Sequence, residues 1–449
     1  MAIFSARTVG FVATILFTLF VMVTPASTKG LSLVRDSEIE NTILSYSAPL
    51  FTVAGLDASA VNVHIINDSR INAFVTGGLN LFVNAGLLMS GENPGPIVGV
   101  IAHETGHLAG GHLARTQEAV KNATTESIIA YVLGAAAILS GRSDAAEAII
   151  GTGNAVAQQS FIRYSQTQER SADQAAVRYL EATGRSAEGL LDLFHQLEDQ
   201  ELLIAERQDP YIRSHPLTRD RIHFVENFIS NAKYHVKPWS DEELLAHRRM
   251  VAKLFAFIYP PSKTLRIYHE GDKSLKARYA RAIAYFRIPD LEKAIAEINS
   301  LISEQPEDPW FLELKGQMLF ENGHIALSIP PYERAVGFRP EEALLRLGLA
   351  RALIEMNETE CNEKAIEHLI AATQFEPHYA EHWHFLGIAY GRNGQLPQSS
   401  LALAEASLLS GNLVEAEYHA EKAKRGLKVG SPSYLRAEDI ALSAKHNNH

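Results

Sequence analysis

Cysteine is nearly absent from this chain, and basic residues are in the minority. Cys361 is the single cysteine among 449 residues, so no disulfide can form within one chain. Lys and Arg number 41 against 52 Asp and Glu, which gives a formal net charge of −11. Because nucleic-acid binding needs a basic surface that gathers phosphates, this balance argues against nucleic acid as a partner. The fold must be stabilised by its packed core and by any metal it binds.

Long hydrophobic runs are also scarce. The first, residues 9–23, carries no charge, follows Arg7 and precedes small residues at 24–27. These features predict a cleaved signal peptide over residues 1–27, and the alternative is an uncleaved membrane anchor at the N-terminus. An exported chain with so little cysteine suggests the bacterial periplasm. The second run, residues 128–139, has 12 residues and is too short to cross a bilayer as a helix.

This second run belongs to a longer segment, residues 127–161, that is rich in apolar and small side chains. The segment has two interpretations. It forms either two buried helices of the core or an exposed apolar flap that makes peripheral contact with a membrane. The sequence leaves both interpretations open.

The rest of the chain divides into parts with different patterns. Residues 28–235 combine helical periodicity with three short strands, at 61–66, 72–76 and 79–83. A helical connector is predicted over 236–272, and residues 273–449 are helical in pattern throughout. The predicted fold class is therefore mainly α with a small β-sheet, an α+β domain followed by an α-solenoid.

Repeats define the last part. Pro306 and Pro340 lie 34 residues apart, which is the period of the tetratricopeptide repeat. Small residues stand ten positions after the prolines at 306, 340 and 377: Gly316, Ala350 and Gly387. Residues 383–390 match the template W-x2-L-G-x2-Y, and the polar stretch 357–363, which contains Cys361, is predicted to be an inserted loop. We expect four repeats, whose stacked helix pairs leave a concave surface for peptides or proteins.

The strongest chemical signal is the sequence His103-Glu104-x-x-His107. On an α-helix, residues i and i+4 share a face, so the two imidazoles project side by side, as the first two ligands of a zinc ion must. Glu104 follows His103 directly and can reach over the metal to act on a water molecule. The pattern predicts a metallopeptidase site on a buried helix over residues 97–113.

A zinc peptidase needs a third protein ligand, and the sequence offers two sources. In the longer pattern HExxHxxGxxH the third histidine would occupy position 113, which is Leu here, and His112 is one residue out of register. The other source is Glu169, which opens a predicted helix with Asp173 four residues on, on the same face. Glu169 can bind the metal while Asp173 accepts a hydrogen bond from a metal-binding histidine.

These motifs together resemble a known family. The matching stretches are His103-Glu-Thr-Gly-His107, Glu169-Arg-Ser-Ala-Asp173, and His215-Pro216 with Arg221-Ile222. Their combination resembles the HtpX/Oma-type gluzincin metallopeptidases. With the signal peptide and the C-terminal repeats added, the chain is most similar to the BepA-type (YfgC-type) periplasmic members, and the similarity covers nearly the whole mature chain.

The resemblance implies how the site is built. One Zn²⁺ per chain would be held by His103, His107 and Glu169, with Glu104 as general base and then proton donor. His215 has two candidate roles: it either hydrogen-bonds the oxyanion of the tetrahedral intermediate or fills the fourth zinc position at rest.

Two further parts of the site follow from the same resemblance. Asp173 and Arg221 would orient the metal-binding segments from behind. The strand over 72–76, with Asn72, Ala73 and Phe74, is similar to an edge strand that pairs with an extended substrate and so recognises its backbone.

The function that the resemblance implies is a periplasmic zinc endopeptidase of envelope quality control. Its partners would be unfolded or misassembled envelope and outer-membrane proteins, with outer-membrane assembly machinery as a further candidate partner of the repeats. The alternative, from a different class, is a chaperone or assembly scaffold for outer-membrane proteins in which the peptidase site is latent. The intact set of His and Glu residues favours the enzyme.

Overall fold

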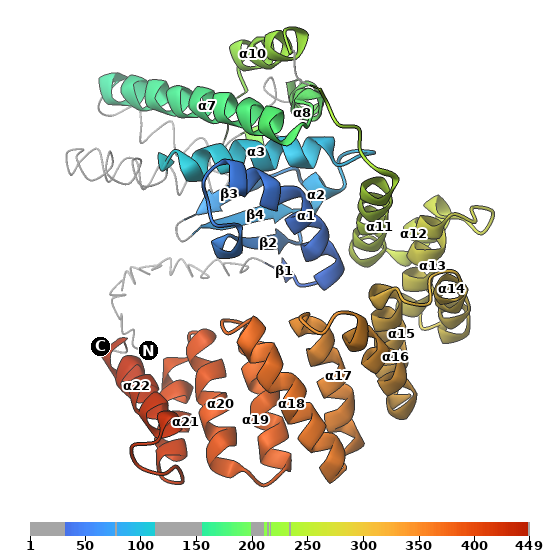
Figure 1. The fold of residues 1–449 in the computed structure, drawn as a ribbon, viewed down its shortest axis with the longest axis vertical. Coiled ribbons are helices and arrows are strands. Elements are labelled where there is room, and N and C mark those ends of the chain that lie inside the picture. The colour runs from blue at the N-terminus through green and yellow to red at the C-terminus, as the bar shows by residue number, and fades with distance from the viewer. Residues whose placement is uncertain are drawn as a thin grey trace, which may run out of the picture.

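The fold is described from a computed structural model that covers residues 32–76, 79–112, 155–198, 211–212, 215, 217–232 and 235–447. The predicted signal peptide (1–27) and most of the apolar segment (127–161) lie outside these residues, so the two interpretations of that segment stay open. Within the described ranges, no helix is both long and apolar enough to span a bilayer. Helices dominate the described residues, which also contain one small sheet near their start (Figure 1). The predicted fold class is confirmed.

Four short strands form the sheet. They are β1 (Leu33–Val34), β2 (Asn62–Ile66), β3 (Ala73–Thr76) and β4 (Asn80–Asn84), arranged in the order β1-β2-β4-β3. β2 and β4 run parallel, while β3 is antiparallel to β4 and occupies one edge. The two strands predicted at 72–76 and 79–83 are therefore present as an antiparallel pair, with β3 as an edge strand.

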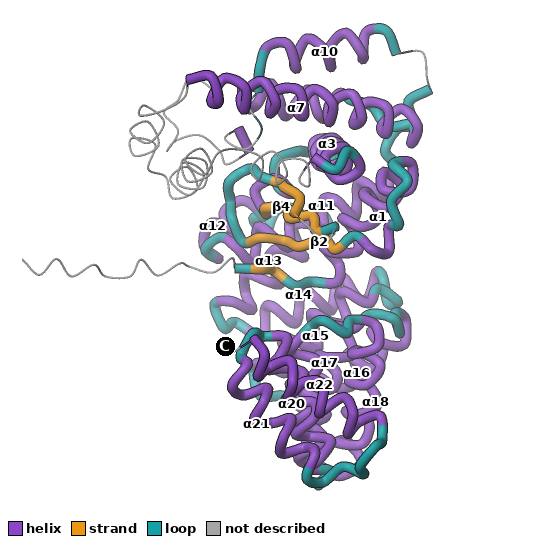
Figure 2. Tube along the Cα trace, turned by 90° about the vertical axis from the view of Figure 1, so that its left-hand side faces the viewer, coloured by secondary structure: helices purple, strands orange, loops and turns teal. Residues whose placement is uncertain are grey.

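Helices cover this sheet in layers. They are α1 (Ser37–Val53), α2 (Ala85–Leu88), α3 (Gly95–Ala109), α7 (Ala155–Thr183), α8 (Glu188–Glu198) and α10 (Arg219–Ser230), with a short 3-10 turn at Ala58–Ala60. Both views place α3 between the sheet and α7 (Figures 1 and 2). α3 is buried along almost its whole length because it packs on α1, α7, α8 and β3.

Two helices lead from this domain to the repeats. α11 (Asp241–Ile258) begins at a capping box, in which Ser240 and Glu243 satisfy each other's backbone N–H groups. α12 (Pro261–Ile267) follows after Tyr259-Pro260. α11 contacts both α1 and α13, so the connector touches the domain on one side and the repeats on the other.

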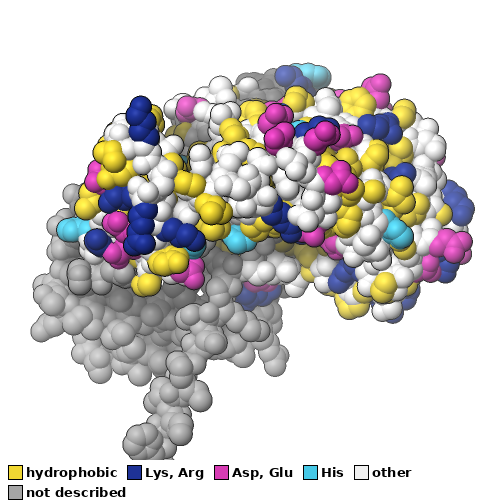
Figure 3. Space-filling view, turned by 90° about the horizontal axis from the view of Figure 1, so that it is seen from below, with side chains coloured by type: hydrophobic (Ala, Val, Ile, Leu, Met, Phe, Trp, Pro, Cys, Tyr) yellow, Lys and Arg dark blue, Asp and Glu magenta, His cyan; other side chains and the backbone are white. Residues whose placement is uncertain are grey.

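The repeats are stacked helix pairs. They comprise α13 (Leu275–Arg287), α14 (Leu291–Glu304), α15 (Pro309–Glu321), α16 (Ile325–Phe338), α17 (Ala343–Met356), α18 (Thr359–Phe375), α19 (Ala380–Arg392), α20 (Leu396–Leu409), α21 (Leu413–Lys424) and α22 (Pro432–Asn447). The row of pairs curves beneath the first domain (Figure 1). Seen from below, acidic, basic and apolar side chains are interspersed over their surface (Figure 3).

Small residues at the predicted repeat positions allow the paired helices to pack closely. A Cβ on Gly316 would lie 2.8 Å from the Tyr332 ring, and one on Gly387 would lie 2.7 Å from Leu403. The predicted loop around Cys361 is wrong, because this residue lies within α18. α18 has 17 residues where α14 and α16 have 14, so the insertion lengthens a helix instead of a loop.

A buried group of charged and phenolic side chains joins the repeats to the first domain, and we call it the interdomain network. Its members are Asp36, Glu38, Arg249, Lys253, Tyr279 and Asp308. Tyr279 donates a hydrogen bond to Glu38 at 2.7 Å, across the boundary between repeats and domain. Arg249 Nη2 lies 2.9 Å from Glu38, and Lys253 Nζ lies 3.2 Å from the same carboxylate.

The outer parts of the network extend this contact. Arg249 pairs with Asp308, the N-cap residue of α15, at 2.6 Å, and Lys253 pairs with Asp36 at 2.6 Å. Farther along the repeats, Arg35 Nη2 lies 2.7 Å from Glu376. The start of the first domain is therefore bonded to α13, at the beginning of the repeats, and to Glu376, which follows α18.

Candidate metal centre

α3 carries the first residues of the site, and its glycines explain how other helices come close. A Cβ on Gly106 would lie 2.9 Å from the Ala172 carbonyl oxygen of α7, and one on Gly99 would lie 2.8 Å from Leu190 of α8. With hydrogen at both positions, α7 and α8 pack directly on α3. His103 and His107, one turn apart on α3, therefore lie within reach of α7 side chains.

α7 contributes Glu169 and Asp173. The predicted helix is present but starts earlier than expected: Glu169 lies in the interior of α7, which begins at Ala155. Glu169 Oε2 is 3.3 Å from His103 Nε2, and Glu169 Oε1 is 3.3 Å from His107 Nε2. The two Nε2 atoms are 3.1 Å apart. One carboxylate and two imidazoles thus converge on a common point.

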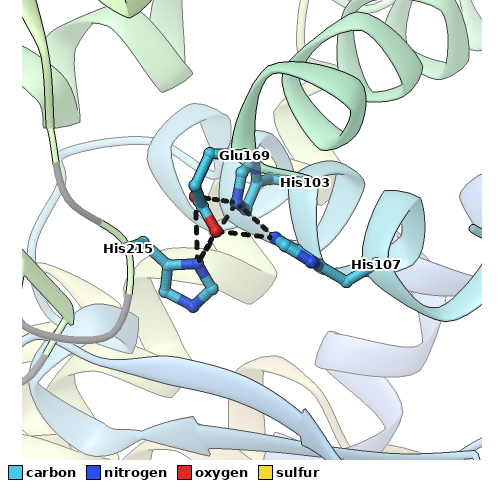
Figure 4. Close-up of side chains that lie close together, drawn as sticks. All are labelled: His103, His107, Glu169 and His215. Atoms are coloured by element: carbon cyan, nitrogen blue, oxygen red, sulfur yellow. Dashed lines mark hydrogen bonds and ion pairs between the residues drawn. The ribbon is translucent and has the colours of Figure 1, made fainter. Parts of the chain in front are cut away.

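His215 is the fourth member of this cluster, and it comes from the segment before α10. Its Nδ1 lies 3.2 Å from both oxygens of Glu169 and 3.4 Å from His103 Nε2. Figure 4 shows the four side chains pointing toward one another from α3, α7 and this segment. Each offers one ligand atom, and these atoms all lie within 4.8 Å of one another.

Asp173 and Arg221 support the cluster from behind. Asp173 Oδ1 lies 2.9 Å from His103 Nδ1, on the side of the ring away from Glu169. Arg221 Nε donates to Asp173 Oδ2 at 2.6 Å, and Arg221 Nη1 is 3.1 Å from Glu169 Oε2. The same guanidinium donates to the His215 carbonyl oxygen at 3.4 Å. Arg221 therefore contacts three parts of the site at once.

Glu104 lies beside the cluster without belonging to it. The residue is 1% exposed, and within the described residues neither carboxylate oxygen has a hydrogen-bond partner. Its Oε1 lies 3.3 Å from His215 Nε2. Burial raises the pKa of Glu104 above its ordinary value, against the pull of His215. A buried carboxylate of this kind is suited to taking up a proton.

The ionisable groups of the cluster are strongly shifted. Burial opposes a charge on His103, but Asp173 and Glu169 outweigh it and raise the His103 pKa to about 9. Burial lowers the pKa of His107 to about 3, despite the hydrogen bond with Glu169. The pKa of Glu169 lies well below its usual range, because His215 and the other imidazoles outweigh its burial. A metal ion must displace the His103 proton to bind.

The residues present fit a bound divalent metal ion. Nitrogen and carboxylate ligands in this number match a metal site with three or four protein ligands. The outward nitrogen of His103 already faces a carboxylate, which is the usual second partner of a metal-binding histidine. Glu104 adds a buried carboxylate beside the site that no hydrogen bond satisfies within the described residues.

His112 and Tyr211 also lie near the cluster. His112 is not among the four converging residues, as its register predicts. Tyr211 was not predicted; its ring centroid lies 4.9 Å from that of His215 and 6.5 Å from that of His103. No motif marks Tyr211 in the sequence, because its position depends on the turn that also carries His215.

The chain is similar in sequence to known metallopeptidases. Residues 35–229 match the model of peptidase family M48. A beta-barrel assembly-enhancing protease from Yersinia pestis is 26% identical over 83% of this chain and 76% of its own length. A protein of the same name from Escherichia coli (strain K12) is 23% identical over 90% of this chain and 82% of its own. Metalloprotease YcaL from the same strain is 29% identical over 40% of this chain and 66% of its own.

The family match and the cluster together identify a metallopeptidase. The chain contains a peptidase family M48 domain, so the resemblance predicted from the motifs is confirmed. The roles of individual residues within the site remain predictions.

Proposed function

We propose that this protein is a zinc-dependent endopeptidase of the bacterial periplasm that hydrolyses misfolded or misassembled envelope and outer-membrane proteins. The observation that carries the proposal is the convergence of His103, His107 and Glu169 on one point with Glu104 beside it. Two imidazoles and one carboxylate form the donor set of a zinc peptidase, and a further glutamate next to the first histidine is placed to act as its general base.

In this proposal His103 Nε2, His107 Nε2 and Glu169 hold the ion. When bound, zinc supplies Lewis-acid chemistry, because it lowers the pKa of water and polarises the peptide carbonyl. Glu104 accepts the proton of the attacking water and passes it to the amine nitrogen of the leaving peptide. Its burial supports this role, since a raised pKa lets the carboxylate hold that proton between the two transfers.

His215 keeps two candidate roles, and its contacts favour one of them. Its Nδ1 points into the cluster, 3.2 Å from both oxygens of Glu169, as a fourth metal ligand at rest would. For the other role, oxyanion stabilisation, the donor would be His215 Nε2, which lies 3.3 Å from Glu104 Oε1. Under the resting-ligand role, His215→Ala raises cleavage of unstructured casein; under the oxyanion role it lowers cleavage by about 10²–10³-fold.

Substrate recognition is assigned to the edge strand β3, with Asn72, Ala73 and Phe74. An extended peptide can add to a free strand edge through main-chain hydrogen bonds, which tolerates many sequences. Two contacts support a position near the metal: α3 packs on β3, and Tyr211 N donates to the Ile71 carbonyl at 3.4 Å. His215 N in turn donates to the Tyr211 carbonyl at 2.8 Å.

The substrate class and location rest on similarity. Relatives over most of the chain are named beta-barrel assembly-enhancing proteases, and we carry over from that name a role on outer-membrane β-barrel proteins. The repeats would recruit these substrates or the machinery that assembles them through their concave face. The alternative is a chaperone or assembly scaffold with a latent peptidase site.

Metal content and casein cleavage of the wild type and Glu104→Gln test the proposal. We expect about one zinc ion per chain in both proteins. We expect cleavage by Glu104→Gln to fall by roughly 10²–10⁴-fold, since it loses its general base. A zinc-loaded wild type that cleaves neither casein nor unfolded β-barrel protein would favour the scaffold. A metal-free, fully active wild type would contradict the proposal.

A further inference from the structure

His112, which the sequence pattern rejects as a metal ligand, contacts a metal ligand directly. The residue is 5% exposed, and its Nδ1 lies 3.0 Å from the Nδ1 of His107. The two ring planes meet at 82°, with centroids 4.9 Å apart. The rings are nearly perpendicular, so they do not stack. The contact joins the two Nδ1 atoms, one of which can donate its proton to the lone pair of the other.

The contact involves the nitrogen of His107 that faces away from the cluster. His107 Nε2 points toward Glu169 and His103, at 3.3 Å and 3.1 Å. A neutral imidazole that gives its Nε2 lone pair to a metal carries its proton on Nδ1. That proton needs a buried acceptor, and His112 Nδ1 is at hydrogen-bond distance.

The chain bends sharply to bring His112 back over its own helix. α3 ends at Ala109, and Gly111 has φ +60, a left-handed conformation that glycine adopts without strain. A Cβ on Gly110 would lie 2.5 Å from His112 Nε2, so the ring occupies space that only glycine leaves open. Gln168, which precedes Glu169 on α7, donates to the His112 carbonyl at 3.4 Å.

We propose that His112 is a positioning residue that fixes the tautomer and orientation of His107 by accepting its Nδ1 proton. It is the counterpart of Asp173, whose carboxylate lies 2.9 Å from His103 Nδ1. One ligand is thus supported by an anionic acceptor and the other by a neutral one. The inference rests on the proposed function, because it requires that His107 binds the metal through Nε2.

Zinc affinity of His112 variants tests this role, measured by competition with a chromogenic chelator on the full chain. His112→Phe keeps a ring but has no acceptor, and we expect zinc to bind about 10–100-fold more weakly. His112→Asn carries its amide oxygen on Cγ, where histidine carries Nδ1, so we expect most of the affinity to return. His223→Phe, at an exposed histidine of α10, is the control and should bind zinc like the wild type.

The pattern of affinities separates this inference from the proposed function. If the wild type binds no zinc, the proposed function fails. If the wild type binds zinc and His112→Phe binds it equally well, the positioning role alone is overturned. Equal losses of zinc affinity in His112→Asn and His112→Phe would also overturn it, because the affinity would then not depend on a hydrogen-bond acceptor at this position. If His112→Phe does not fold, His112→Leu and His112→Asn, which match in size, give the same comparison.

Discussion

Two clusters of buried ionisable side chains differ in what balances their charges. In the interdomain network, the cations Arg249 and Lys253 face the carboxylates of Asp36, Glu38 and Asp308 at 2.6–3.2 Å. In the metal centre, imidazole and carboxylate atoms face one another at similar distances. In the first cluster the cations lie between the carboxylates, whereas in the second Arg221 lies behind the ligands, which direct several lone pairs at one point.

This difference distinguishes a structural ion-pair network from a ligand site. Buried charges are tolerated when opposite charges compensate them, as in the network. Convergent acceptors are tolerated when a proton or a metal ion lies between them, and the raised pKa of His103 and the lowered pKa of Glu169 reflect that requirement. The comparison predicts that zinc stabilises one cluster and leaves the other unchanged.

The largest expected effect comes from zinc itself. A ligand that binds only the folded state stabilises it by about 4 kcal/mol when its concentration is about a thousand times its Kd. Thermal unfolding with and without zinc should show this gain in the wild type, and Glu169→Gln should lose most of it together with its casein cleavage. Glu38→Gln, in the interdomain network, should keep the zinc-dependent gain. A zinc-dependent gain that survives in Glu169→Gln would remove this residue from the ligand set.

The sequence singled out the side chains that converge in the candidate metal centre, but it did not indicate the interdomain network. His103, Glu104 and His107 belong to one short motif. Glu169 is marked by Asp173, which stands four residues later on the same helix face. The contact of His112 with His107 could not be read from helical periodicity, because the helix ends at Ala109 and the chain turns at Gly110-Gly111.

The fold shows the same division. The repeats and the strands at 62–66, 73–76 and 80–84 follow from periodicity and turn residues. Periodicity does not predict the two-residue strand β1. It also does not predict the ion pairs that join the start of the domain to distant repeats, since Arg35 and Glu376 are 341 residues apart. No local pattern specifies such a contact; it depends on the curvature of the whole stack of helices.

Within the network, Lys253→Met should have the largest effect. The change removes a buried ammonium and leaves Asp36 and Glu38 with one fewer counter-charge, which we expect to cost about 3 kcal/mol of unfolding free energy. Urea unfolding measures it. Arg170→Ala is the matched control, because its ion pair with Asp220 is exposed and should contribute less than about 1 kcal/mol. Equal losses in both variants would mean that the network is no more than a surface ion pair.

Acid should weaken the network by a smaller amount. Burial raises the pKa of Glu38, but Arg249 and Lys253 outweigh it and hold the pKa below its ordinary value. A lowered carboxyl pKa contributes stability that is complete above the unfolded pKa of about 4.3 and is lost as the pH falls below it. The stability gap between wild type and Glu38→Gln should therefore stay constant from pH 6 to about pH 5 and shrink below about pH 4.3. A gap that also stays constant at the lower pH would mean that Glu38 is not ionised in the folded protein.

The finest test removes one hydrogen bond from the boundary between the domain and the repeats. Tyr279→Phe deletes the hydroxyl that donates to Glu38 at 2.7 Å, and a hydrogen bond to a charged group contributes about 1.5–3 kcal/mol. We expect the lower end, about 1.5 kcal/mol in urea unfolding, because Arg249 and Lys253 still face the carboxylate.

Tyr285→Phe is its matched control on the same helix. The Tyr285 hydroxyl also donates to a carboxylate, that of Glu270 at 3.0 Å, but Glu270 is exposed to solvent. Water replaces this bond when it is lost, so the expected cost is about 0.5 kcal/mol. Zinc affinity should be unchanged in both variants. If Tyr279→Phe instead weakened zinc binding, the two clusters would be coupled, and the repeats would act on the metal centre through α1.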